Sequence, residues 1–234
     1  MKVAIMQPYI FPYIGYFQLI NIVDKFIIYD DVNFIKKGWI NKNKILNNGS
    51  ELYFSIPIKK SSQNKLINEL LLGNDYDYWK KKFLNSLNFS YKKTPNFESS
   101  YNLISRILNY ETLELSKLLK FSILETCDFL EIPTNIYTSS KAMYENSNLK
   151  SSDRILDICK KEKSSEYINL IGGINLYEKK EFQKYNIELK FIRTLSFKYN
   201  QISNDFHKNL SIIDIIMNCS KEEIKNMLLL YNLE

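Results

Sequence analysis

The chain has 234 residues, of which 45% are hydrophobic, and a formal net charge of +6. It is long enough to bury a full core without metals or disulfides, and its three scattered cysteines form no CxxC pair, which argues against a zinc site or a disulfide framework. The modest charge argues against nucleic acid and suits an anionic small molecule, while it also permits contact with acidic lipids. No apolar run reaches the length of a membrane span and no signal peptide is recognisable, so we expect a cytoplasmic protein.

The first sixty residues alternate between short apolar runs and one helical segment. Residues 2–7 form a β-like run that ends at a proline, residues 15–23 carry the apolar spacing of a helix face, and residues 25–31 form a buried strand that ends in two carboxylates. Strand, tight loop, helix and strand within about thirty residues is the βαβ pattern, which implies a parallel sheet with a right-handed crossover. Two further strands are predicted at 40–46 and 51–58, joined by the turn NNGS.

The middle of the chain, residues 75–131, is predicted to be mostly helical, and α/β alternation then returns. The later predicted elements are strands at 134–140, 166–171 and 187–192, helices at 151–163 and within 172–185, and two amphipathic helices within 210–231. Ser151 or Ser152 is the expected N-cap of the helix at 151–163. These patterns predict an α/β fold with a mainly parallel, Rossmann-like sheet flanked by helices, in one domain spanning 1–234 with a helical insertion at about 75–131.

The segment QPYIFPYIGYF directly follows the first predicted strand. In open parallel sheets ligands bind at the carboxyl ends of the strands, which is where this loop lies. Its two prolines fix the backbone, and Gly15 permits a close approach at the start of the following helix, where an anion is favoured. Gln7, Tyr13 and Tyr16 offer polar groups and flat faces to a base or a sugar. The alternative is a stiff aromatic loop that only packs beneath the sheet.

Asp30 and Asp31 end the second predicted strand at the same edge, and Lys36 and Lys37 follow them. We expect these groups to converge with Gln7 and the loop tyrosines on one pocket. Asp30 and Asp31 are the candidate general bases, Asp31 is the candidate Mg²⁺ ligand beside substrate phosphates, and Lys37 would stabilise phosphate charge. A pair of acids at a strand end is also a common cap and loop anchor, and that alternative stays open.

Two further stretches suggest binding groups. In WINKNKI, Trp39 and Asn41 share one face that could hold a sugar, although an amphipathic edge strand explains the same alternation. Gly172 and Gly173 lie between a predicted strand and a predicted helix, where backbone N–H groups could cradle phosphate. The sequence contains no GxGxxG or GxxxxGK[ST] motif, which argues against a standard dinucleotide site or P-loop. The only histidine, His207, lies in a polar loop, and its role stays open.

The opening MQPYIFPYIGYFQLINIVDKFIIYDDVNFIKKGWINKNKIL strongly resembles that of the WbqC-like protein family, and the resemblance continues in residues 148–182 and 209–219. Members of this family look like components of bacterial O-antigen, capsule or flagellar-glycan gene sets, and some are labelled glycine transferases. The resemblance therefore implies a transferase of surface-glycan biosynthesis that attaches an amino acid or acyl group to an amino sugar. It implies a nucleotide-linked amino sugar or a small amino acid as partner, and it allows other enzymes of the glycan pathway.

A more distant resemblance links the same opening to nucleotidylyltransferases and pantothenate synthetases with an HxGH signature. The corresponding tetrapeptide here is YIGY, so both histidines that would stabilise an α-phosphate are absent. The later stretch NLKSSDRI is similar to the Ser/Lys phosphate-binding stretch of such domains. That similarity implies phosphate contacts from Lys150, Ser151, Ser152 and Arg154, whereas a capped helix start is the simpler interpretation.

Three functions stay open at this point. The first is an enzyme that activates an amino acid as an acyl-nucleotide and transfers it to a sugar amine, with ATP or another nucleotide and Mg²⁺ as cofactors. The second is nucleotidyl transfer to a small acid or alcohol at the same site. The third is a non-catalytic module that lacks the HxGH histidines and only binds a nucleotide sugar or a partner enzyme.

Overall fold

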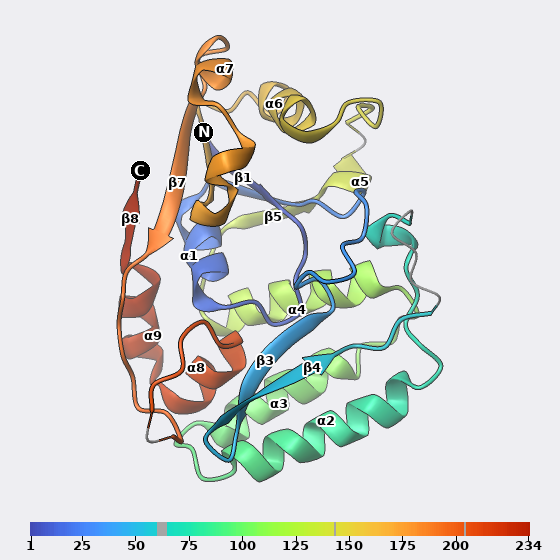
Figure 1. Ribbon diagram of the computed structural model, residues 1–234, viewed down its shortest axis with the longest axis vertical. Helices are drawn as coiled ribbons and strands as arrows, with labels where there is room; N and C mark the ends of the chain where they lie inside the picture. Colours follow the sequence, from blue (N-terminus) through green and yellow to red (C-terminus); the bar gives the residue numbers. More distant parts are fainter. Residues whose placement is uncertain (60–64, 143, 204) are drawn as a thin grey trace.

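A computed structural model describes residues 1–59, 65–142, 144–203 and 205–234, and within them a six-stranded sheet forms the centre of the fold (Figure 1). The strand order is β5-β2-β1-β6-β7-β8. The strands are β1 (Lys2–Met6), β2 (Lys25–Ile28), β5 (Asn135–Thr138), β6 (Glu166–Leu170), β7 (Glu188–Thr194) and β8 (Tyr231–Leu233). The first five of these strands in sequence are parallel, which confirms the predicted sheet.

The edge strand β8 was not predicted, and it pairs antiparallel with β7. Its three residues are too few to show the alternation of a strand, and they follow a helix directly. Only the exposed edge of β7 gives this segment a hydrogen-bonding partner, so its conformation depends on tertiary structure.

Alternate side chains of the central strands point to opposite faces and build two separate cores. On one face Val3, Ile5 and Ile27 pack with Ile158 and Phe182 from the helices on that side. The helices on that side are α6 (Ser151–Lys161) and α7 (Lys179–Gln183), and they lie above the sheet in Figure 1. Because both faces are covered, the central strands consist almost entirely of apolar residues.

The opposite face carries the larger core. Its helices are α1 (Ile14–Ile22), α2 (Tyr76–Tyr91), α3 (Phe97–Leu108), α4 (Leu115–Phe129), α8 (Ile212–Asn218) and α9 (Lys221–Leu228). Three of them, α2 to α4, occupy the segment predicted as a helical insertion, between β2 and β5 in chain order. Among the described residues there are three further short helices, η1 (Ile67–Glu69), α5 (Ser139–Ala142) and η2 (Ile171–Leu176).

The strands predicted at 40–46 and 51–58 form a hairpin of their own outside the main sheet. This hairpin comprises β3 (Lys42–Asn47) and β4 (Ser50–Ser55), with Ile45 opposite Leu52. One residue of its turn, Gly49, has a φ of +74°, which a glycine adopts without strain.

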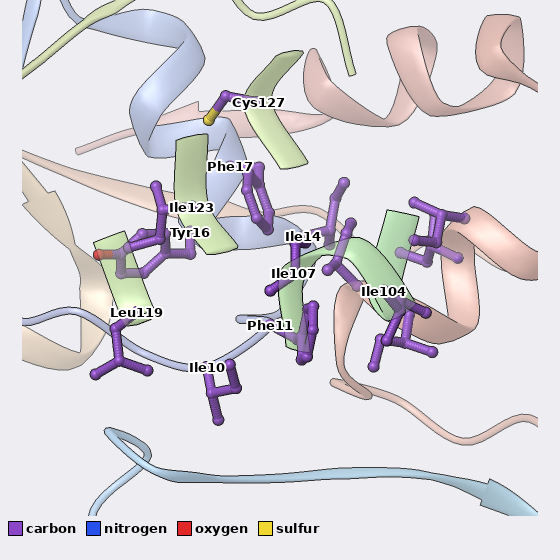
Figure 2. Close-up of a cluster of buried hydrophobic side chains, with 14 of the residues drawn as sticks. Ile10, Phe11, Ile14, Tyr16, Phe17, Ile104, Ile107, Leu119, Ile123 and Cys127 are labelled. Atoms are coloured by element: carbon purple, nitrogen blue, oxygen red, sulfur yellow. The ribbon is translucent and has the colours of Figure 1, made fainter. Parts of the chain in front are cut away.

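The hairpin also holds the loop that follows β1. Phe11 in this loop has a φ of +42°, which is unfavourable for a bulky side chain. Its carbonyl oxygen accepts hydrogen bonds from Asn43 Nδ2 at 2.7 Å and from Ser211 Oγ at 2.8 Å, and the neighbouring Ile10 carbonyl accepts a second bond from Asn43 at 3.0 Å. The rings of Phe11 and Phe17 are buried in the larger core (Figure 2). Hydrogen bonds and burial together hold this strained turn in place.

In the part of the chain that the structure describes, no helix combines the length and apolar character needed to cross a bilayer.

Replacing Asn43 with alanine should destabilise the protein strongly. The substitution removes one donor from two buried carbonyls. The Phe11 carbonyl keeps its bond from Ser211, whereas the Ile10 carbonyl loses its side-chain donor, and a buried group left unsatisfied costs about 1–3 kcal/mol. Urea unfolding should therefore show a free energy of unfolding lower by about 1–3 kcal/mol. Asn85→Ala on the exposed face of α2 is the matched control and should change it by less than about 0.5 kcal/mol. Equal stability of the two variants would contradict the anchoring role of Asn43.

Candidate active site

The strand order reverses between β1 and β6, and the loops that follow these strands leave the sheet in opposite directions. Such a switch point leaves a crevice at the carboxyl edge, and open α/β sheets bind ligands there. A cavity of about 400 Å³ lies at this place, and we call it the switch-point cavity. Its lining residues are Tyr9, Pro12, Tyr13, Trp39, Asn43, Ile171, Ile192, Arg193, Thr194 and Asn209.

The switch-point cavity has aromatic walls and one cation. Tyr9 and Tyr13 come from the loop after β1, and Trp39 remains 45% exposed. Burial raises the pKa of Tyr13 to about 12 and also raises that of Tyr9, so both phenols stay neutral hydrogen-bonding groups at physiological pH. Arg193 pairs with Glu234 at the surface, with 2.5 Å between Nε and Oε1. An exposed ion pair of this kind contributes little to stability, so an incoming anion can replace the carboxylate of Glu234.

A second hollow of about 250 Å³ adjoins the switch-point cavity and shares Tyr13, Thr194 and Asn209 with it. Phe197 and Phe206 contribute aromatic faces here, and we call it the aromatic hollow. Its further lining residues are Ile14, Leu195, Ser196, Tyr199, His207, Lys208, Leu210 and Ile215. The sequence left the role of His207 open; in the structure its Nε2 lies 3.1 Å from the carbonyl oxygen of Gly49.

Gly15 controls how closely these walls approach one another. A Cβ atom at this position would lie 2.4 Å from Cε2 of Tyr13 and 2.7 Å from Oγ1 of Thr194. The sequence predicted a close approach at the start of this helix. In the structure the groups that lie close to Gly15 are the side chains of Tyr13 and Thr194, and both of them line the two hollows. Gly172 is different, because a Cβ atom there would have no neighbour within 4 Å, whereas at Gly173 it would lie 3.0 Å from Nδ2 of Asn169.

The two carboxylates at the end of β2 form a separate network toward β5. Asp30 accepts hydrogen bonds from the Ser139 hydroxyl and from both the backbone N–H and the hydroxyl of Ser140. Desolvation raises the pKa of Asp30, and the bonds from Ser140 oppose that rise. Asp31 accepts from Ser139 through Oδ1 and from Arg154 through Oδ2, the latter at 2.7 Å. Both acids are thus firmly positioned in the free protein.

Arg154 donates three hydrogen bonds within this network. Its side chain is 8% exposed and donates to both the carboxylate and the backbone carbonyl of Asp31 and to Oδ1 of Asn146. Arg154, a phosphate contact in the sequence analysis, and Asp31, a candidate base there, therefore meet in the structure as an ion pair.

The donor set around Asp31 does not fit a magnesium ion. Each carboxylate oxygen already has a partner, and the guanidinium of Arg154 repels a second cation. Across residues 1–59, 65–142, 144–203 and 205–234, no group of three or more His, Cys, Asp and Glu side chains is arranged to hold a metal.

The other predicted site residues lie in several places. Tyr16 is fully buried and its hydroxyl donates to the carbonyl of Gln7, so this tyrosine supports the loop from beneath and offers no face to a ligand. Asn41 is buried, and its amide donates to the Ile56 carbonyl at 2.8 Å, which holds the hairpin. Lys37 is exposed in the segment between β2 and β3.

The predicted phosphate-binding stretch lies at the start of α6. The N-cap is Lys150, not Ser151 or Ser152 as expected, and its side chain forms no capping hydrogen bond. Ser151 is the first helical residue and has a φ of +48°. Lys150 and Ser151 are exposed, while Arg154 one turn later is buried against Asp31.

Sequence reasoning missed Arg193, Thr194 and Asn209 in the switch-point cavity, and Ser139 and Ser140 around the acids. The two serines had a usable signal, because they are the last two residues of the strand predicted at 134–140, at the same sheet edge as Asp30. Arg193 and Thr194 lie at the end of the last parallel strand, which the prediction ended at 192.

A family model for WbqC-like proteins matches residues 7–226, from the loop after β1 into α9. The chain belongs to the WbqC-like protein family. This WbqC-like chain is also similar to an uncharacterized protein of Mycobacterium tuberculosis, Rv1507c, with 28% identity over 225 residues that cover 94% of this chain and 95% of the relative. No solved structure matches it. The match includes every residue of the switch-point cavity and of the acidic network.

The glycines of the WbqC-like chain provide a matched pair of substitutions. Gly15→Ala must displace Tyr13 or Thr194, and such overpacking costs about 1–3 kcal/mol, of which the better helix propensity of alanine offsets at most about 1 kcal/mol. Gly172→Ala meets open space and should be neutral or slightly stabilising. Of the two variants, only Gly15→Ala should show a lower Tm in thermal unfolding. An unchanged Tm for Gly15→Ala would refute the close approach of Tyr13 and Thr194 to this glycine.

Proposed function

We propose that this WbqC-like protein is a transferase of bacterial surface-glycan biosynthesis that attaches an amino acid or acyl group to a nucleotide-linked amino sugar. The observation that carries the proposal is the position of the switch-point cavity and the aromatic hollow, side by side at the place where open α/β sheets take nucleotides. Family membership supports a role in glycan assembly through the resemblance described above.

The two hollows suit different parts of such a ligand. A base can stack on Phe197 or Phe206 in the aromatic hollow, since every base has an apolar face. A sugar can lie on Tyr9 and Trp39 in the switch-point cavity, whose 400 Å³ falls within the usual range for ligand sites. Arg193 at the wall of that cavity offers a bidentate partner to a phosphate between base and sugar.

The proposed reaction has two balanced steps. An oxygen of the amino-acid carboxylate first bonds the α-phosphorus of ATP, and pyrophosphate leaves. The sugar amine then attacks the acyl carbon, the bond from that carbon to the phosphate oxygen breaks, AMP leaves, and a carboxylate takes the proton that the amine loses. Asp31 is the candidate base, because its side chain is 21% exposed beside the strand end, and Lys37 or Lys150 would stabilise the phosphate charge.

One observation favours a non-catalytic nucleotide-sugar-binding module as the second candidate. Asp30 and Asp31 are both held by hydrogen bonds within the protein, and Asp31 is ion-paired with Arg154. These hydrogen bonds and the ion pair occupy the carboxylate oxygens that a catalytic base would offer to the sugar amine. Nucleotidyl transfer to a small acid or alcohol would use the same switch-point cavity and forms a third outcome of the assays below.

Trp39→Ala should weaken binding of a UDP- or dTDP-linked amino sugar. Loss of an aromatic face costs about 1–3 kcal/mol per stacked ring, which corresponds to a rise in Kd of roughly ten- to a hundredfold. Calorimetric titration measures the change, with Tyr78→Ala as the control, because Tyr78 is 68% exposed on α2 and does not line the cavity. Equal affinity in both variants would exclude Trp39 from the binding site.

Product formation with ATP, glycine and a nucleotide-linked amino sugar separates the enzyme from the binding module. For the enzyme, Asp31→Asn should abolish turnover with nucleotide affinity nearly unchanged, and Lys37→Ala should lower turnover roughly ten- to a hundredfold through loss of a charge-assisted hydrogen bond. Thermal unfolding of each variant checks that the fold persists. Full activity in both variants would remove these residues from the mechanism. Binding without any product would favour the non-catalytic module.

A further inference from the structure

We propose that a second cavity, between α4 and the carboxyl ends of β2 and β5, binds a small polyhydroxylated anion such as a sugar phosphate or a sugar carboxylate. This cavity of about 600 Å³ is lined from α4 and from the segments that follow β2 and β5, and we call it the α4 cavity. Among the residues that the structure describes, it shares no lining residue with the switch-point cavity. The inference therefore stands independently of the transferase proposal.

The charges that line the α4 cavity leave an excess of positive charge. Lys117, Lys120 and Lys141 supply three ammonium groups. Of the two acids there, Glu114 pairs with Lys117 at 2.6 Å, and Asp30 is already satisfied by hydrogen bonds from the serines after β5. Three ammonium groups thus face two carboxylates, and within the described part of the chain Lys120 and Lys141 form no ion pair, so these two lysines are free to contact an anion.

Two side chains of the same wall carry a buried polar atom that has no hydrogen-bond partner among the described residues. These atoms are Oδ1 of Asn68 and Oγ1 of Thr138, and Thr138 is 7% exposed. Buried polar groups in native proteins are almost always satisfied, and each exception calls for a ligand, an ion or a water. An amide oxygen accepts and a threonine hydroxyl both donates and accepts, so the complementary ligand carries hydroxyl groups.

Another part of the wall is aromatic. Tyr110 and Phe121 stack with their ring centroids 4.2 Å apart and an interplanar angle of 16°, and both rings line the α4 cavity. The C–H face of a sugar ring packs well on such a surface. The lysines match an anionic group, the polar atoms without partners match hydroxyl groups, and the stacked rings match an apolar ring face. A sugar that carries a phosphate or a carboxylate combines all three.

Calorimetric titration should therefore detect binding of glucose 6-phosphate or glucuronate, and a preference between them identifies phosphate or carboxylate as the anionic group. Inorganic phosphate has the anionic group without the sugar ring, and glucose has the ring and its hydroxyls without the anionic group. Each should therefore bind at least tenfold more weakly than the sugar anions. Inorganic phosphate binding as tightly as glucose 6-phosphate would overturn the inference, because the lysines would then act as an unspecific anion surface.

Two variants locate the site. Lys120→Gln should weaken binding about tenfold. Thr138→Val should also weaken it, yet leave the Tm of the ligand-free protein unchanged or raised, because it removes a hydroxyl that has no partner there. Lys81→Ala on the exposed face of α2 is the control and should bind normally. Unchanged affinity in both site variants, or no binding of either sugar anion at millimolar concentration, would refute the proposal.

Discussion

The strained turn at Phe11 is the constraint on which the rest of the site depends. Its positive φ turns the chain from the end of β1 back toward α1, and this conformation persists only because Asn43 and Ser211 hold its carbonyl while the ring is buried. Asn43 belongs to the hairpin and Ser211 caps α8. The turn thereby joins three distant parts of the chain and fixes Tyr9 and Tyr13 on either side of it as cavity walls.

Buried polar groups, in place of metals or disulfides, tie the outer elements to this centre. Asp214 of α8 is fully buried and accepts hydrogen bonds from Tyr91 at 2.8 Å and Tyr199 at 2.6 Å. Desolvation raises the pKa of Asp214, and the donated bonds oppose that rise. Gln18 does the same for α1, because its amide donates to the Met227 carbonyl and accepts from Thr194. These networks set the geometry of the aromatic hollow, since Tyr199 and Thr194 line it.

The site could be predicted only in part. Strand ends placed Asp30, Asp31 and the loop at one edge, and the parallel pairing of β1 with β2 gives them that common edge. The loop tyrosines line the switch-point cavity there, whereas the two acids form a separate network toward β5. Tyr16 and Asn41 look like ligand groups in sequence, but tertiary packing buries both of them. Sequence spacing shows which residues share one face of a short helix or strand. It does not show whether another layer of the fold covers that face, and this coverage decides whether a polar side chain binds a ligand or supports the backbone.

The sequence by itself determined the α/β class, the parallel sheet and the helical insertion, because apolar periodicity and turn residues are local properties of the chain. Only the tertiary structure decided the strand order and therefore the switch point, the pairing of Arg154 with Asp31, the edge strand β8 and the α4 cavity. Each of these depends on contacts between residues far apart in the chain, such as the 123 positions between Asp31 and Arg154. Local pattern carries no information about which distant segment completes such a contact.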